Sequence, residues 1–129
     1  MSKKRIIVFV CEHGAAKSIL AAVHFNRLAG EMEWDLHAVA RGANPDPELS
    51  PQTVKGLFED GLIPTEVSPQ KINVADVQSA ERVIAFCELP VEYHQQGMIE
   101  RWDDVPPVSE NYEKARDEIL KRIRQMLRS

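Results

Sequence analysis

The chain has 129 residues, of which 43% are apolar, and a formal net charge of −4 at pH 7. This length suits one domain with one core, and the mixed charges argue against a general nucleic-acid binder. The two cysteines are too few for a disulfide framework, the N-terminus lacks the pattern of a secretory leader, and no apolar run approaches the roughly 18 residues of a membrane span, so we expect a cytoplasmic protein with free thiols and no membrane partner.

The first third of the chain alternates between strand-like and helix-like segments. Residues 5–10 are almost entirely apolar, as in a central parallel strand that is buried on both faces. Residues 18–29 carry apolar side chains at helical spacing, and Gly30 after them predicts the end of a helix. Residues 34–41 alternate between apolar and polar, which favours a half-exposed strand near a sheet edge.

The middle of the chain continues this alternation. After a turn-rich connector, Ser50 and Pro51 predict the N-cap and the first position of a helix that Gly61 closes. Residues 68–73 are predicted as a short third strand, and residues 74–79 as a short helix.

The last third supplies one more strand and one more helix. Residues 82–87 are predicted as an apolar strand that ends on Cys87, and residues 112–126 have apolar spacing typical of a helix. The alternation predicts one α/β domain with a four-stranded parallel sheet and helices on both faces. Ligands of such sheets bind beyond the carboxyl ends of the strands, where Cys11 and Cys87 are both expected.

The segment CEHGAAKS, residues 11–18, lies where the first strand ends and the first helix begins. Its small residues Gly14, Ala15 and Ala16 let the loop curl so that backbone N–H groups face an anion, and the helix adds the positive end of its dipole. The same donors favour a thiolate at Cys11, which makes that sulfur a candidate nucleophile.

Two further residues of this segment have expected roles. Lys17 supplies a cation at the helix entrance, and the hydroxyl of Ser18 can either hydrogen-bond the thiolate or cap the helix. A single cysteine at a strand end can also be a small buried hydrophobe, and that alternative stays open for Cys11. The combination of strand, cysteine, small-residue loop, cation and serine favours the nucleophile.

A metal site is not expected. The histidines and cysteines lack the compact paired spacing of a zinc site, whether in Cys11-x-His13 or in the scattered His24, His37, Cys87 and His94. We expect neither a metal nor another cofactor.

The segment VFVCEHGAAKSILAA resembles the active-site loop of the low-molecular-weight protein tyrosine phosphatases and of the thiol-coupled or thioredoxin-coupled arsenate reductases. Their loop has Cys, five residues, Arg, then Ser or Thr. The likeness continues in ARGANPDPELSPQTVKGLFEDGLIP, ERVIAFC and WDDVPPVSENYEKARDEILKRIRQML. It implies one domain over residues 1–129 with the phosphotyrosine protein phosphatase I-like fold and flavodoxin-like winding.

The resemblance also implies roles for individual residues. Cys11 would be the nucleophile, and Ser18 would support its thiolate. The oxyanion would be held by the loop that follows the cysteine: Glu12, His13, Gly14, Ala15, Ala16, Lys17 and Ser18.

Two positions depart from the family pattern. Lys17 stands where the family has Arg, so a point charge replaces a planar fork that binds two oxygens. Pro106 stands where the family's acid loop has the Asp that protonates the leaving group. Asp104 is the first candidate to replace that acid and Asp103 the second, the alternative for both being ordinary exposed turn residues.

Cys87 leaves the chemistry open. It matches the resolving cysteine of the resembling arsenate reductases, which attacks the arsenic adduct of the nucleophile, although it can equally be a packed thiol. The resemblance therefore implies a phosphatase that hydrolyses phosphate monoesters through a phosphocysteine. The alternatives are an arsenate reductase that uses Cys87 or an external thiol reductant, and an oxyanion-binding module with weakened catalysis.

Overall fold

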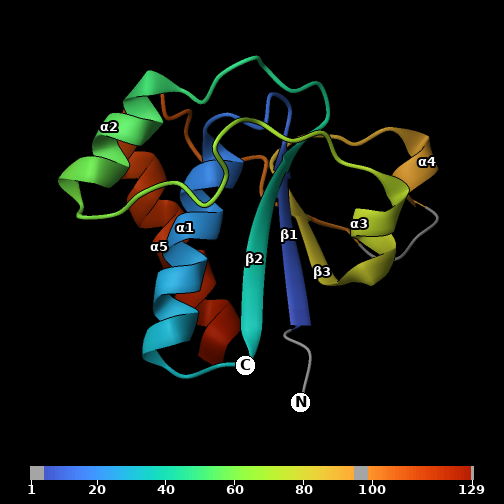
Figure 1. Ribbon diagram of the computed structural model, residues 1–129, viewed down its shortest axis with the longest axis horizontal. Coiled ribbons are helices and arrows are strands. Elements are labelled where there is room, and N and C mark those ends of the chain that lie inside the picture. The colour runs from blue at the N-terminus through green and yellow to red at the C-terminus, as the bar shows by residue number, and fades with distance from the viewer. Residues whose placement is uncertain (1–4, 95–98, 129) are drawn as a thin grey trace.

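The computed structural model describes residues 5–94 and 99–128, and its centre is a parallel sheet (Figure 1). The strands are β1 (Arg5–Cys11), β2 (Leu36–Gly42), β3 (Ala80–Ala85) and β4 (Ile99–Arg101). Their spatial order is β2-β1-β3-β4, and every pair is parallel. The helices are α1 (Lys17–Glu31), α2 (Pro51–Glu59), α3 (Val74–Ser79), α4 (Val91–His94) and α5 (Tyr112–Arg128).

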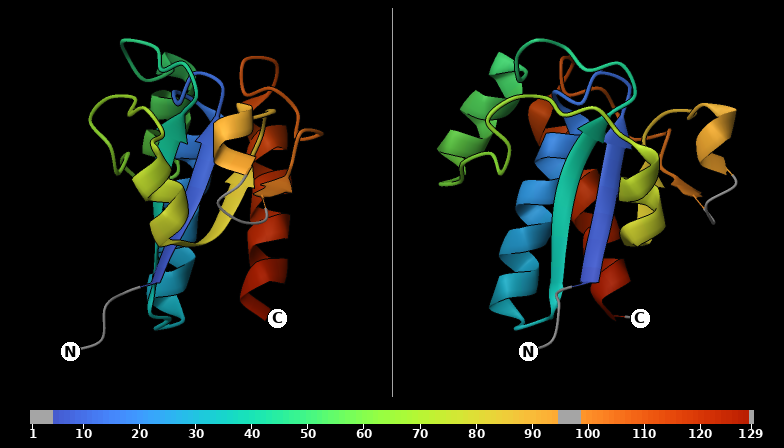
Figure 2. Two further views of the ribbon diagram at one scale, coloured as in Figure 1. Left: turned by 90° about the vertical axis from the view of Figure 1, so that its right-hand side faces the viewer. Right: turned by 45° about the vertical axis from the view of Figure 1, so that its right-hand side comes forward.

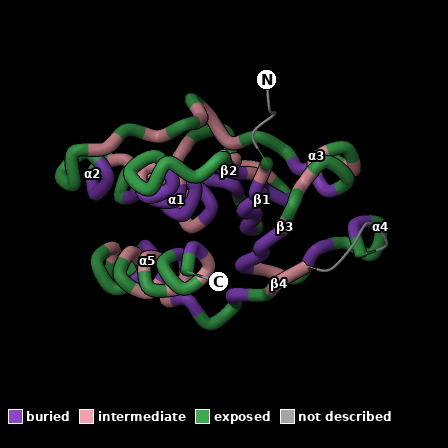
Figure 3. The backbone as a smooth tube through the Cα atoms, turned by 90° about the horizontal axis from the view of Figure 1, so that it is seen from below, coloured by how far each residue is buried: buried purple, intermediate pink, exposed green. Residues whose placement is uncertain are grey.

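The helices lie on both faces of the sheet (Figure 2). Helices α1 and α5 cover one face and contact each other, and α2 packs against both of them. Helices α3 and α4 lie together on the opposite face, as the view from below shows (Figure 3). The predicted α/β class, with a four-stranded parallel sheet between helices, is confirmed. Within the two described ranges, no helix has the length and apolar character needed to span a bilayer.

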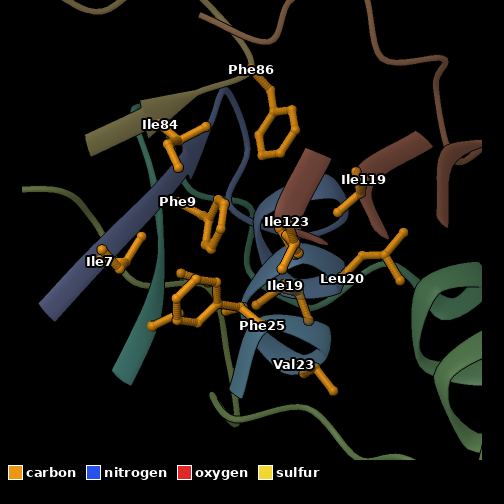
Figure 4. Packing of buried hydrophobic residues seen from close by; sticks show 14 of the residues in the cluster. Ile7, Phe9, Ile19, Leu20, Val23, Phe25, Ile84, Phe86, Ile119 and Ile123 are labelled. Carbon is orange, nitrogen blue, oxygen red and sulfur yellow. The ribbon is translucent and has the colours of Figure 1, made fainter. Parts of the chain in front are cut away.

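Strand β1 is buried from both sides because successive side chains point to opposite faces of a sheet. Ile7, Phe9 and Cys11 belong to the core under α1 and α5, whereas Val8 and Val10 belong to the core under α3 and α4. Phe9 lies at the centre of an aromatic group, with ring centroids 5.9 Å from Phe25 and 6.4 Å from Phe86 (Figure 4). The alternation sends the Cys11 side chain to the α1 face.

The prediction of a third strand over residues 68–73 is wrong. This segment touches β2 only through a bridge between Gly42 and Lys71, and its extended course stops because Asn73 caps α3. The side chain of Asn73 accepts a hydrogen bond from the N–H of Asp76, and the Asp76 side chain accepts one from Asn73 in return. The fourth strand is instead β4, a segment too short to show periodicity.

Two predicted boundaries also move. Helix α1 runs past Gly30 to Glu31, and the chain leaves it through Glu33, which has a positive φ of 55°. Strand β3 ends at Ala85, so Cys87 lies in the loop beyond it. The predicted start of α2 is confirmed, since the Ser50 side chain accepts a hydrogen bond from the N–H of Thr53.

Candidate active site

Cys11 and Ser18 meet at the end of β1. Cys11 is only 8% exposed, and its Sγ lies 3.1 Å from the Oγ of Ser18, which is fully buried in the first turn of α1. The N-cap of α1 is Ala16, with no side-chain hydrogen bond. Of the two roles that the sequence allowed for Ser18, the observed contact is the one with the thiol.

The loop after Cys11 is held by a connector, defined here as residues 43–50. The backbone N–H groups of Ala43, Asn44, Asp46 and Ser50 donate to four loop carbonyls, at 2.7–3.0 Å. The accepting carbonyls belong to residues 11, 12, 13 and 15. In a trans peptide the next N–H points opposite to the carbonyl, so the N–H groups of residues 12, 13, 14 and 16 point away from the connector.

These N–H groups remain available for a ligand. In the described part of the chain, the backbone N–H groups of residues 12–16 have no hydrogen-bond acceptor. Successive free N–H groups beside a helix N-terminus form an anion-binding concavity. The local arrangement can therefore hold an oxyanion next to the sulfur of Cys11.

Two glycines let the loop lie this close to β2. Gly14 has a φ of +63°, a conformation that side chains rarely adopt. A Cβ on Gly42 would lie 2.6 Å from the Gly14 nitrogen, and a Cβ on Gly14 would lie 2.9 Å from the Gly42 Cα. Gly42 thus has a part in shaping the loop that the sequence did not indicate.

A cavity of about 830 Å³ opens over the loop. Cys11 and Cys87 both line it, together with the acidic residues Glu12, Asp46 and Glu48. Phe86, Leu49 and Val108 supply apolar surface. The structure thus brings the two cysteines to one cavity at the carboxyl end of the sheet, the rim on which the sequence predicted them.

Lys17 lines the same cavity but has a protein partner. Its Nζ donates a hydrogen bond of 2.8 Å to the carbonyl oxygen of Val105 and lies 6.0 Å from the centroid of the Phe86 ring. The cation therefore lies beside the loop of residues 12–16, called the anion loop below. Its hydrogen bond connects it to the segment after β4 that carries the predicted acids.

Asp103 and Asp104 lie apart from the cavity lining. The Nε of Arg101 donates to Asp103 at 2.8 Å, and Arg122 donates to Asp104 at 2.8 Å. The bond from Arg101 holds the pKa of Asp103 below its ordinary value, and the bond from Arg122 does the same for Asp104. A carboxyl with a lowered pKa is ionised at neutral pH and has no proton to donate.

Cys87 is a poor thiolate in this environment. Burial, followed by the nearby charge of Cys11, raises the pKa of the Cys87 thiol to about 11. Both cysteines are free thiols. Cys87 also packs against the core under α3, whereas Cys11 belongs to the core under α1.

A histidine and an aspartate at the cavity form a pair that the sequence reasoning did not identify. The Nδ1 of His13 lies 3.3 Å from the Oδ1 of Asp46, and the N–H of Asp46 donates to the carbonyl of His13. Beside them, the Nδ2 of Asn44 donates to Glu12 at 2.8 Å. One feature of the sequence indicates such a pair. The connector follows the carboxyl end of β2, and this end lies at the same edge of the sheet as Cys11.

Comparison with solved structures identifies the fold as the one found in low-molecular-weight protein tyrosine phosphatases and arsenate reductases. The chain is similar to YfkJ from Bacillus subtilis, with a TM-score of 0.83 and 18% identity over 98% of this chain and 94% of that one. It is similar to the thioredoxin-dependent arsenate reductase Cg_ArsC1' from Corynebacterium glutamicum, with a TM-score of 0.80 and 20% identity over 98% of this chain and 62% of that one.

A third similar structure is a low molecular weight protein tyrosine phosphatase from T. tengcongensis, with a TM-score of 0.77 and 20% identity over 96% of this chain and 98% of that one. No protein-family model and no curated protein matches the sequence. At these identities, the likeness to solved structures establishes the fold alone.

Proposed function

We propose that this chain is a cysteine-dependent phosphatase of the low-molecular-weight type, which hydrolyses phosphate monoesters through a phosphocysteine at Cys11. The observation that carries the proposal is the 3.1 Å contact between Cys11 Sγ and Ser18 Oγ at the base of a loop with unpaired N–H groups. A buried hydroxyl beside a buried sulfur stabilises the thiolate, and the loop stabilises the charge that develops on the phosphoryl oxygens.

The residues then have distinct tasks. The thiolate of Cys11 attacks phosphorus, and the N–H groups of residues 12–16 bind the phosphoryl oxygens. Ser18 stabilises the thiolate before attack and again when water releases it. Lys17 balances the negative charge of the phosphoryl group once its ammonium exchanges the Val105 carbonyl for a phosphate oxygen. We assign the task to one domain over residues 1–129 and, from its free thiols, to the cytoplasm.

Arsenate reduction is the second candidate, because Cys87 lines the same cavity as Cys11. The thiolate of Cys11 would displace an oxygen of arsenate, and the thiolate of Cys87 would then attack Cys11 Sγ. The S–S bond forms as the S–As bond breaks. The electron pair of the S–As bond stays on arsenic, which is thereby reduced from As(V) to As(III). The pKa of about 11 at Cys87 slows this step, which favours the phosphatase. An external thiol reductant would restore the cysteines.

Parallel assays of phosphate-ester hydrolysis and arsenate reduction test the proposal, with Cys11→Ser and Cys87→Ser as matched variants. A phosphatase hydrolyses p-nitrophenyl phosphate, forms a phosphorylated Cys11 that mass spectrometry detects, and tolerates Cys87→Ser. If arsenate reduction is observed and both variants abolish it, the reductase is correct. If phosphate protects Cys11 from alkylation but neither reaction occurs, the chain is an oxyanion-binding module.

A further inference from the structure

We propose that His13 is the general acid and base of this site and that Asp46 is its positioning residue. This inference rests on the proposed phosphatase function and names the group that protonates the leaving oxygen.

A backbone hydrogen bond brings Asp46 to His13, and the two side chains then meet. The N–H of Asp46 donates to the His13 carbonyl at 3.0 Å, which sets the connector against the loop, and the Asp46 carboxylate lies 3.3 Å from the ring Nδ1. The two side chains are 62% and 50% exposed and form an ion-pair contact rather than a hydrogen bond, and a carboxylate this close favours the proton on Nδ1. Nε2 is then the ring nitrogen that can exchange a proton with substrate.

The location of the pair suits this task. His13 follows Cys11 by two residues, and both His13 and Asp46 line the cavity that Cys11 lines. Asp103 and Asp104 lie outside that lining and are each bonded to an arginine. A proton donor at the cavity is therefore available from the loop and connector rather than from the segment that follows β4.

Other ionisable groups surround the pair. Glu12 accepts a hydrogen bond from Asn44, and Lys17 donates to Val105, so both have partners of their own. The remaining ionisable groups of the cavity lining are Glu48, Cys11 and Cys87. His13 is the one imidazole among the described residues that line this cavity.

The proton transfers balance over two steps. In the first step, the Cys11 thiolate forms the S–P bond, the ester P–O bond breaks, and its electron pair stays on the leaving oxygen, which takes the proton from Nε2 of protonated His13. In the second step, a water oxygen forms a bond to phosphorus, the S–P bond breaks to restore the thiolate, and Nε2 accepts the water proton. Inorganic phosphate leaves, and His13 is protonated again.

Leaving-group dependence tests this inference on the full chain. We expect His13→Asn to slow hydrolysis of phenyl phosphate by about 100- to 10,000-fold, because its leaving group needs a proton. The kcat/KM for p-nitrophenyl phosphate, which reports the first step and involves a leaving group that is stable as an anion, should fall by less than about tenfold, whereas its kcat should fall further because His13 also serves as the base when water releases the phosphocysteine. Asp46→Asn keeps its backbone N–H and should show the same selectivity to a smaller degree, through kcat with KM unchanged.

Three variants serve as comparisons. Asp35→Asn changes an exposed aspartate far from the cavity lining and should leave both rates unchanged. Asp103→Asn and Asp104→Asn test the acids that the sequence suggested. If either of them slows phenyl phosphate selectively while His13→Asn does not, the assignment to His13 is overturned and the phosphatase function stands. If the unchanged protein hydrolyses neither ester, the proposed function fails first, and the inference fails with it.

Discussion

The ammonium group of Lys17 donates a hydrogen bond of 2.8 Å to the carbonyl oxygen of Val105, across 88 positions of the chain. This bond joins the anion loop to the segment after β4, and it gives the cation a neutral acceptor. A phosphate oxygen carries a negative charge that the carbonyl lacks, so a phosphate held by the anion loop would compete with Val105 for Nζ. Under the proposed function, substrate binding and the position of the Val105 segment would therefore be coupled through one side chain.

We predict opposite effects for two substitutions at Lys17. Lys17→Arg restores a planar fork that binds two oxygens and should raise turnover of p-nitrophenyl phosphate, by up to about 100-fold if it adds one transition-state donor. Lys17→Ala removes the charge and should weaken phosphate binding, measured as protection of Cys11 from alkylation. If neither substitution changes binding or turnover, Lys17 serves only to hold Val105.

The two cysteines should differ in reactivity. Because burial and the charge of Cys11 raise the pKa of Cys87 to about 11, iodoacetamide should modify Cys87 slowly at pH 8, with a rate that rises about tenfold per pH unit up to that pKa. In Cys11→Ser the nearby charge is absent, so the pKa of Cys87 should fall. Mass spectrometry of each thiol against pH measures both quantities. An unchanged Cys87 profile in Cys11→Ser would show that burial and the other nearby charges, such as that of Glu12, set this pKa without Cys11.

Two glycine substitutions should change stability in opposite directions. Gly42→Ala places a Cβ 2.6 Å from the backbone of Gly14 and should lower the free energy of unfolding by about 1–3 kcal/mol. Gly30→Ala meets no atom within 4 Å inside α1 and should raise it by about 0.5–1 kcal/mol. Urea unfolding measures both, and only Gly42→Ala should also reduce phosphate protection of Cys11. Equal effects would contradict the close approach of Gly14 and Gly42.

His24 should make stability depend on pH. Burial, and next the charge of Arg27, lower the pKa of His24 from 6.5 to about 4, and its Nε2 has no hydrogen-bond partner among the described residues. Below pH 6.5 the unfolded chain binds a proton that the folded chain takes up only near pH 4. The free energy of unfolding should therefore decrease between these values, by on the order of 3 kcal/mol.

The matched variant for this prediction is His24→Phe, which keeps a ring and has nothing to titrate. The difference in unfolding free energy between the two proteins should change across pH 6.5 to 4 and be constant above it. A difference in unfolding free energy that is constant over the whole pH range would mean that His24 has the same pKa in the folded and unfolded chains.

The sequence predicted the central elements because their signals are local. Residues 5–10 are apolar enough to require burial on both faces, and Ser50 followed by Pro51 matches the chemistry of a helix start. The strand predicted over residues 68–73 does not form, because Asn73 caps α3 and the chain there turns into a helix. Strand β4 was not predicted, because its three residues are too few to show an alternation of apolar and polar side chains. A pattern within a short stretch of sequence does not show whether a strand or a helix start will form there.

The site was predictable only where the chain is contiguous. The segment from Cys11 to Ser18 carries its own geometry, so the contact between those two residues was among the expected ones. The partners of Asp103 and Asp104 come from separate elements, and so does Asp46 for His13. These pairs depend on how strands and loops meet in space, which neither composition nor spacing encodes.

The four hydrogen bonds that hold the anion loop use only backbone atoms of the connector. Their donors are residues 43, 44, 46 and 50, and the two prolines of the connector, Pro45 and Pro47, lie between donors where no N–H is needed. Side chains at 47, 48 and 49 line the cavity without taking part in these bonds. The cavity lining can therefore be redesigned at the exposed Pro47 and Glu48 while the anion loop keeps its shape, provided that proline stays out of the four donor positions. Leu49 also packs against the core under α1 and α5, so its side chain has a structural task as well.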